Sequence, residues 1–182
     1  MKKVMLLLVV LFTVNTITAQ KINWVSFEEA IELQKKEPRK IIVDMYTVWC
    51  GPCKRMDRDT FENKDVVEYV NKNYYAVKFN AQGNEEVTFK GRTFTNPNYK
   101  PELAKRRNGT HQLALYYKVQ AFPTVVFIDE NSEFLTPLRG YKTPQQLELY
   151  LKLFKEDKHK EMTTQDAFDA YFKAFKPEFK TK

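Results

Sequence analysis

Short apolar runs alternate with stretches of helical periodicity along the middle of the chain. Runs rich in β-branched and aromatic residues predict strands, whereas apolar residues spaced three or four positions apart predict helices. The run at 40–47 contains few polar residues, which is typical of a strand that is covered on both faces. The predicted strands cover 22–25, 40–47, 74–81, 122–129 and 134–141.

Helix starts are predicted between these strands. Ser26 and Glu29 have the spacing of a capping box, and Thr110 is expected to cap a short helix ahead of the fourth strand. Strands that alternate with helices favour a parallel sheet core, and the closing hairpin adds antiparallel strands. The sequence therefore predicts an α/β fold with a mixed central sheet flanked by helices. Further helix starts are predicted at the C-G-P-C segment 50–53, at Lys64 and at Thr143, which has the spacing of a capping box with Gln146.

Regular periodicity fades over 82–109, a polar segment between two predicted elements. A long irregular stretch inside a small domain is usually a functional loop. We expect its aromatic residues Phe89, Phe94 and Tyr99 to close over a bound polypeptide, because long loops on a rigid scaffold often set specificity. We also expect a short Gly-Ser turn to replace the segment without loss of the fold. The alternative is a loop that folds away over the edge of the sheet.

The residues after 156 form a separate extension. It contains four aromatic residues with the i, i+3, i+4, i+7 spacing of a helix face: Phe168, Tyr171, Phe172 and Phe175. We expect this aromatic stripe to pack back on the domain, with a partner-binding face as the alternative. The predicted organisation is a signal peptide at 1–19, a domain at 20–156 with its insertion at 82–109, and a helical extension at 157–182.

The first 19 residues have the layout of a secretory signal peptide. Lys2 and Lys3 form a short basic region, an unbroken apolar run follows over 4–12, and Ala19 offers the small residue before a cleavage point. We therefore expect export, to the periplasm, with no stable membrane insertion after cleavage. Ile17 is bulky for its position two residues before Ala19, so an uncleaved N-terminal membrane anchor is the alternative.

Composition and charge narrow the class of partner. Of the 182 residues, 43% are hydrophobic and 14% aromatic, as in a globular domain. Removing 1–19 takes away two of the 30 basic residues and none of the 23 acidic ones, which leaves a net charge of +5. The basic residues are mostly interleaved with acidic ones, so we predict a solvated surface and no nucleic-acid partner.

Cys50 and Cys53 are the only cysteines in the chain, and two residues separate them. A structural zinc site needs four ligands, and the two histidines, His111 and His159, show neither zinc-ligand spacing nor the context of a catalytic Cys–His pair. Haem attachment needs a histidine directly after the second cysteine, where this chain has Lys54. A redox-active dithiol is therefore the preferred interpretation, with no metal and no cofactor.

The position of the pair, between a strand and a helix start, gives the two thiols different roles. Unpaired N–H groups at a helix N-terminus stabilise an anion, so Cys50 is expected to ionise easily and to act as the nucleophile. Cys53, one turn into the helix and more covered, is expected to resolve the mixed disulfide. Gly51 and Pro52 set the turn that keeps the two sulfurs within bonding distance.

The W-C-G-P-C-K sequence at 49–54, together with the F-P-T sequence at 122–124 before a strand, resembles the thioredoxin family. The resemblance covers about 24–154 and implies a thioredoxin fold, with a long insertion before the strand that follows a cis proline. That proline is Pro123, and the resemblance places it opposite the two sulfurs. The substrate-binding residues that it implies are Trp49, Gly51, Pro52, Pro123 and Phe122, whose backbone would pair with the substrate chain.

The same resemblance assigns Asp44 and Lys78 to the site. Asp44 stands six residues before Cys50, where the family has a buried carboxylate that helps proton transfer for the inner thiol. Lys78 matches the lysine that partners this carboxylate. A carboxylate is costly to bury unpaired, which supports the pairing independently. The alternative is that Asp44 points to solvent.

These features favour an exported thiol:disulfide oxidoreductase that reduces disulfides in other proteins. The G-P dipeptide between the cysteines resembles the reducing members of the family. Reduction in an oxidising compartment requires an electron donor, which we expect to be a membrane protein. The alternatives are a disulfide oxidase or isomerase, and a binding module in which the thiols are secondary.

Overall fold

The fold is known from a computed structural model that describes residues 21–181. The predicted signal peptide at 1–19 lies outside these residues, so the structure does not test it. Among the described helices, none combines the length and the apolar character needed to span a membrane.

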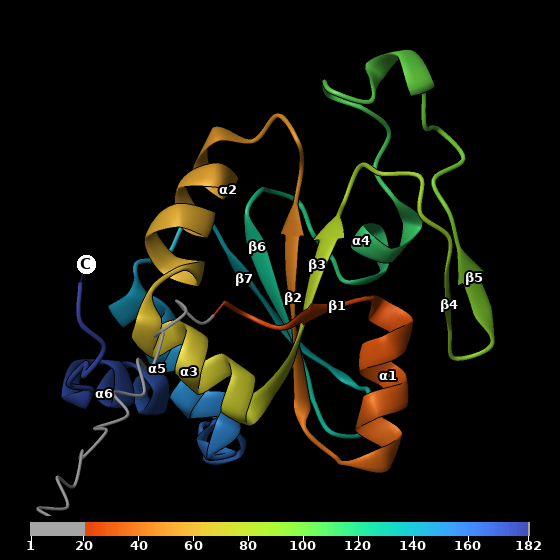
Figure 1. The fold of residues 1–182 in the computed structure, drawn as a ribbon. Helices are drawn as coiled ribbons and strands as arrows, with labels where there is room; N and C mark the ends of the chain where they lie inside the picture. The colour runs from red at the N-terminus through yellow and green to blue at the C-terminus, as the bar shows by residue number, and fades with distance from the viewer. Residues whose placement is uncertain (1–20, 182) are drawn as a thin grey trace, which may run out of the picture.

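A mixed central sheet forms the middle layer of the domain (Figure 1). Its strands are β1 (Trp24–Val25), β2 (Lys40–Tyr46), β3 (Tyr74–Asn80), β6 (Thr124–Ile128) and β7 (Phe134–Arg139). Their order across the sheet is β1-β3-β2-β6-β7, in which β1, β3 and β2 run parallel while β6 and β7 are antiparallel to their neighbours. Each predicted range contains one of these strands, and the parallel core with its closing hairpin is confirmed.

Helices cover both faces of this sheet (Figure 1). They are α1 (Phe27–Lys36), α2 (Gly51–Met56), α3 (Lys64–Asn73), α4 (Gln112–Tyr116) and α5 (Pro144–Lys155). Along β2, Ile41 and Val43 face a core shared with α1 and α4, while Ile42 faces a second core shared with α2, α3 and α5. Successive side chains of a strand alternate between faces, so Asp44 lies on the face that α2 covers.

The insertion contains a hairpin of two short strands, β4 (Val87–Phe89) and β5 (Arg92–Phe94). The turn between them places Lys90 at φ 49° and Gly91 at φ 72°. Two successive residues with positive φ form the type I′ turn that matches the twist of a hairpin. The segment 82–109 is therefore not the irregular loop that the sequence predicts.

The hairpin is part of the hydrophobic core. Phe89 is 4% exposed and Phe94 1%, and both belong to the core cluster that includes Phe27 of α1. Phe89 and Phe94 therefore do not close over a polypeptide, and the prediction is wrong for these two of its three rings. A Gly-Ser turn in place of 82–109 would remove these rings from the core, so the structure argues against the expectation of an unchanged fold.

The helix that follows the insertion has a different cap from the predicted one. His111 caps α4, because its Nδ1 accepts a hydrogen bond from Leu113 N at 3.1 Å, so Thr110 is not the cap. His111 Nε2 lies 2.6 Å from the carbonyl oxygen of Glu85, which ties α4 to the insertion. Burial lowers the pKa of His111, which favours the neutral ring that accepts through one nitrogen and donates through the other.

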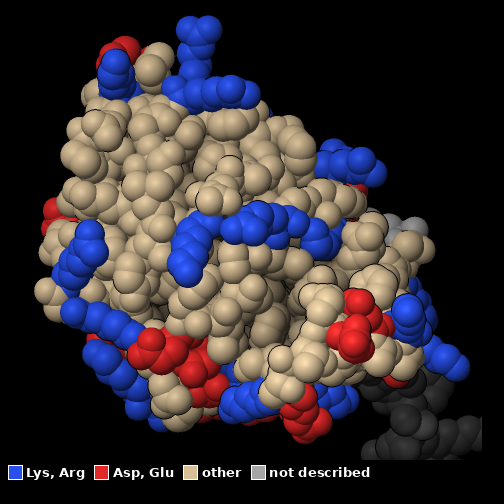
Figure 2. All heavy atoms as spheres, turned by 180° about the vertical axis from the view of Figure 1, so that it is seen from behind, with Lys and Arg blue, Asp and Glu red and all other residues tan. Residues whose placement is uncertain are grey.

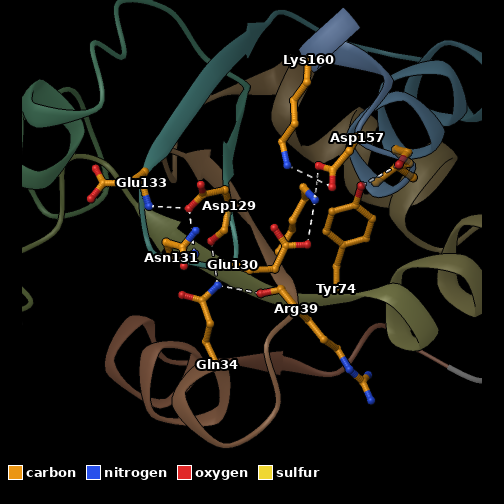
Figure 3. A network of polar contacts seen from close by, with 11 residues as sticks. Gln34, Arg39, Tyr74, Asp129, Glu130, Asn131, Glu133, Asp157 and Lys160 are labelled. Atoms are coloured by element: carbon orange, nitrogen blue, oxygen red, sulfur yellow. Dashed lines mark hydrogen bonds and ion pairs between the residues drawn. The ribbon is translucent and has the colours of Figure 1, made fainter.

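A buried lysine at the start of β2, the end of the strand opposite to the cysteines, fastens the C-terminal extension to the sheet. Its two carboxylate partners, Glu130 and Asp157, are labelled in Figure 3. Lys40 is 1% exposed, and its Nζ lies 2.7 Å from Glu130 Oε1 and 2.8 Å from Asp157 Oδ1. Burial lowers the pKa of Lys40, but hydrogen bonds and charges from Asp157 and Glu130 outweigh burial and raise it above its usual value. The charged lysine therefore holds Asp157, where the extension begins.

The extension continues through a 3₁₀ turn, η3 (Lys158–Glu161), into α6 (Gln165–Ala174). Phe168 and Tyr171 of α6 pack against the second core, as predicted, whereas Phe172 is 57% exposed. Beyond α6, the fully buried Glu148 of α5 accepts hydrogen bonds from the Glu178 backbone N at 2.9 and 3.0 Å. The extension is thus packed along the domain.

Replacing Phe94 by alanine tests whether the insertion belongs to the core. Phe94→Ala truncates a ring that is 1% exposed, so it should lower the free energy of unfolding in urea by about 3–5 kcal/mol. Phe172→Ala is the matched control, because that ring is 57% exposed and its truncation should cost about 0.5 kcal/mol or less. Equal losses in the two variants would show that the hairpin does not contribute to the core.

Candidate redox site

The cysteine pair lies between the end of β2 and the start of α2. Cys50 and Cys53 form a disulfide with an S–S distance of 2.11 Å. Cys50 is the N-cap residue of α2, and the Cys53 backbone N donates to Cys50 Sγ at 3.1 Å. Pro52 occupies the first turn, where its missing N–H leaves no helical hydrogen bond unmade. The positive end of the helix is therefore directed at Cys50 Sγ.

Both cysteines are covered to a similar degree, which corrects one expectation. Cys50 is 2% exposed and Cys53 is 3% exposed, so Cys53 is not the more covered of the two. Gly51 and Pro52, between them, are exposed. The feature that distinguishes the two sulfurs is therefore the N–H group directed at Cys50, and not their access to solvent.

The turn before β6 lies next to the cysteine turn. The peptide bond between Phe122 and Pro123 is cis, and Pro123 is buried. The Pro123 carbonyl accepts a hydrogen bond from Gly140 N at 2.8 Å, which fixes this turn to the end of β7. The Phe122 ring lies edge-on to the Trp49 ring, with 6.2 Å between their centroids. The fold thus brings the F-P-T and C-G-P-C segments together.

Asp44 is buried on β2 and shares a lysine with a second carboxylate. It is 2% exposed, and its Oδ2 lies 3.1 Å from Lys78 Nζ, while Asp57 Oδ1 contacts the same ammonium group. Burial raises the pKa of Asp44 to about 6, against the opposing charge and hydrogen bond of Lys78. Burial lowers the pKa of Lys78, but Asp44 and Asp57 together raise it above its usual value. Asp44 therefore titrates close to neutral pH, whereas Lys78 stays charged.

Aromatic rings surround the Lys78 ammonium. Its Nζ lies 5.1 Å from the ring centroid of Tyr46, 5.3 Å from that of Trp24 and 5.9 Å from that of Phe61. Ring faces attract a cation, and the attraction is stronger where water is excluded. The rings therefore help to hold the charge of Lys78 beside Asp44.

Asp57 is a member of this cluster that the sequence did not reveal. It begins a π-helical turn, η1 (Asp57–Phe61), that continues α2. Its backbone N–H donates to the carbonyl of Cys53, and its carboxylate contacts Lys78 on β3. One short stretch of helix therefore links the second cysteine to the charged pair in the sheet. An aspartate four residues after a cysteine carries no sequence signal of its own, so only the fold could identify it.

The insertion reaches the site through Trp49. The indole Nε1 of Trp49 donates to Gln82 Oε1 at 2.7 Å, and the Asn108 backbone N donates to the same oxygen at 3.0 Å. The guanidinium carbon of Arg107 lies 4.7 Å from the centroid of the Trp49 ring. Sequence reasoning missed these three residues of the insertion, because only the folded chain brings its two ends to Trp49.

Comparison with known proteins agrees with this geometry. A profile described as a thioredoxin-like domain matches residues 27–155, which is well over half of the chain. The chain belongs to the thioredoxin-like family. The thioredoxin fold expected from the two motifs is thereby confirmed, and the disulfide between Cys50 and Cys53 lies within the matched residues.

Individual relatives of this thioredoxin-like chain are distant. The disulfide bond reductase DsbH of Chlamydia pneumoniae is 25% identical over 120 residues, which cover 65% of this chain and 63% of the relative, less than two thirds of its length. A solved structure of a DsbH oxidoreductase has a TM-score of 0.53 at 21% identity, over 80% of this chain and 90% of its own. A solved putative disulphide-isomerase from Bacteroides thetaiotaomicron has a TM-score of 0.50 at 27% identity, over 75% of this chain and 94% of its own.

The raised pKa of Asp44 makes the stability of this thioredoxin-like domain depend on pH. Because the pKa is about 6 in the folded state and 3.8 for a free aspartate, the folded state binds more protons between these values. The ionised carboxylate therefore destabilises the fold above pH 6, and the penalty disappears as the pH falls below 4. Asp44→Asn should be more stable than the wild type at pH 7.5, and this advantage should shrink by about 2–3 kcal/mol by pH 4.

Urea denaturation of the oxidised protein at several pH values measures this change. Asp59→Asn is the control, because the hydrogen bond from Arg58 lowers the pKa of Asp59. The Asp59 carboxylate stabilises the fold at neutral pH and loses that effect as the pH falls, so its variant should show a trend of the opposite sign. A stability difference for Asp44→Asn that does not vary with pH would contradict the raised pKa.

Proposed function

We propose that this chain reduces disulfide bonds in other proteins, and that it does so after export to the periplasm. One observation carries the proposal: the Cys53 N–H group is directed at Cys50 Sγ from 3.1 Å at the start of α2. A thiolate at Cys50 would be stabilised there, as a nucleophile requires. The relative from Chlamydia pneumoniae is described as a disulfide bond reductase, and the layout of residues 1–19 supports export.

In the proposed cycle, the Cys50 thiolate attacks one sulfur of a substrate disulfide. A bond forms between Cys50 Sγ and that sulfur, and the other substrate sulfur leaves as a thiolate. Cys53 then loses its proton and attacks Cys50 Sγ, which releases the second substrate thiolate and produces the disulfide seen in the structure. Two electrons have passed to the substrate, so an external dithiol must reduce the pair again. We propose a membrane-bound donor for this step.

Asp44 is the proposed proton acceptor for Cys53. With a pKa of about 6, Asp44 is mostly ionised at neutral pH and can still take up a proton. Lys78 holds the carboxylate in place and is itself held by Asp57 on its other side. The decay of the mixed disulfide should therefore slow as Asp44 becomes protonated, and a pH profile of this step that shows no such transition would exclude the role.

The substrate is proposed to meet the protein at the exposed turn and the rings beside it. Gly51 and Pro52 are exposed, and Trp49 and Phe122 lie edge to face next to them. Pro123 is buried in the adjoining turn, which leaves the backbone of Phe122 as the group proposed to pair with the substrate chain. These residues therefore border both the C-G-P-C turn and the turn before β6.

The reduction potential of the cysteine pair distinguishes a reductase from an oxidase or isomerase. We expect this potential, measured in equilibrium with a dithiol buffer, to be close to that of thioredoxin. The thioredoxin potential lies about 150 mV below that of strong disulfide oxidants. The wild type should reduce insulin, and Cys50→Ser should not. A potential close to that of the oxidants would favour an oxidase or isomerase, while the absence of thiol-dependent insulin reduction would point to a binding module.

Serine variants test the order of attack. Cys53→Ser should accumulate mixed disulfides with substrate proteins through Cys50, because the thiol that releases them is absent. Cys50→Ser should accumulate few, because Cys53 Sγ lacks the helix N–H group that Cys50 Sγ receives. Non-reducing electrophoresis and mass spectrometry identify the trapped cysteine. Trapping mainly through Cys53 would reverse the assignment.

A further inference from the structure

A groove of about 530 Å³ lies next to the segments that lead into Cys50 and Pro123. Trp49, which precedes Cys50, and Phe122, which precedes Pro123, both line it. Arg107, from the insertion, and Leu115, from α4, line the same groove. The groove therefore adjoins the two segments that carry Cys50 and Pro123.

Part of the groove is apolar and open to solvent. Leu115 is 59% exposed, and Ala121 and Val119 line the groove with it. Tyr116, the neighbour of Leu115 in α4, is 42% exposed. Large exposed apolar side chains beside a cavity are typical of a contact surface. This part of the groove suits an aliphatic side chain.

Arg107 gives the groove a positive charge. Its guanidinium lies against the Trp49 ring, and among residues 21–181 no carboxylate lies within ion-pair distance of it. Because it has no carboxylate partner among these residues, the charge of Arg107 is available to a ligand. Figure 2 views the molecule from behind: Lys and Arg side chains lie at the top, along a band across the middle and at the lower edge, whereas Asp and Glu side chains lie mainly in the lower part.

Hydrogen bonds fix Arg107 in its place. Asn108, the next residue, accepts from Lys100 N and donates to Lys100 O through its side chain, each at 2.8 Å. The Asn108 backbone N donates to Gln82 Oε1, the atom that also holds the Trp49 indole. The guanidinium, the indole and the groove are thus positioned by one connected set of contacts before any substrate binds.

We propose that this groove selects protein disulfides whose cysteine lies in an extended segment with an acidic and an aliphatic side chain. Arg107 receives the carboxylate and Leu115 receives the aliphatic group. The inference rests on the proposed reductase function and adds the substrate class to it. Charge complementarity carries it: a cation without a carboxylate partner lies on the ring of Trp49, the residue before Cys50, and an acidic segment satisfies it.

Matched peptides test the selection. Each peptide is extended and carries leucine and one variable residue close to a cysteine, which is joined by a disulfide to a fluorescent thiol. The variable residue is Glu, Gln or Lys, and it is placed on either side of the cysteine. Single-turnover release of the fluorescent thiol by the pre-reduced protein gives a second-order rate constant for each peptide. Hydroxyethyl disulfide, which is small and uncharged, reports the thiol chemistry alone.

The wild type should react about twofold to fivefold faster with the Glu peptide than with the Gln peptide at low salt, which is the range for an exposed ion pair. The preference should shrink at high salt because the charges are screened. Arg107→Gln should remove the preference, and Arg107→Glu should reverse it toward the Lys peptide. Arg106→Gln is the control and should keep the preference, because Arg106 is exposed and does not line the groove.

The outcomes separate the inference from the function on which it rests. If the wild type reduces hydroxyethyl disulfide and all peptides but does not prefer Glu, the reductase function stands and the selection is overturned. A preference that persists in Arg107→Gln also overturns it. If the wild type reduces none of these disulfides, the proposed function fails and the inference fails with it.

Discussion

The buried polar groups of the site depend on the charge of Lys78. A carboxylate as deeply buried as that of Asp44 is costly without a counter-charge, and Lys78 supplies it from the neighbouring strand, where the two residues are paired in register. Asp57 binds the same ammonium from the helix that carries the cysteines. One side chain therefore joins β2, β3 and the end of α2. The position of Cys53 relative to the sheet follows from this contact, because the Asp57 backbone N–H is bonded to the carbonyl of Cys53.

The parts of the fold that the sequence could predict are those with a local physical signal. Apolar runs marked the strands, and the capping box at Ser26 marked a helix start, because burial and capping act on residues close in the chain. The redox pair was readable for the same reason, since a strand, a turn and a helix start follow one another within a few residues. For Asp44 and Lys78 the family resemblance named the pair, and the cost of burial gave it an independent physical reason.

Other parts depend on contacts that form only after folding. The strands β4 and β5 are too short for a period to be read, and the Lys90–Gly91 turn between them is not one of the Asn-Gly or Asp-Gly pairs that usually mark a hairpin. The cap at His111 relies on Nδ1 of a ring whose other nitrogen, Nε2, contacts the Glu85 carbonyl oxygen in the insertion. The similar coverage of Cys50 and Cys53 likewise results from packing around the turn, which neighbours in sequence do not determine.

The structure of the insertion also bears on the substrate selection that we propose. The hairpin is anchored in the core, and Asn96 Nδ2 donates to Gly83 O at 2.8 Å and to Gly109 O at 2.7 Å, so both ends of the insertion are held together. Gly109 packs so closely against Asn98 that a Cβ atom there would lie 2.6 Å from the Asn98 carbonyl oxygen. A segment with these contacts does not act as a lid that closes over a ligand. Its residues beside Trp49 instead form a preformed wall, so a substrate that fits does not bear the entropic cost of ordering a loop.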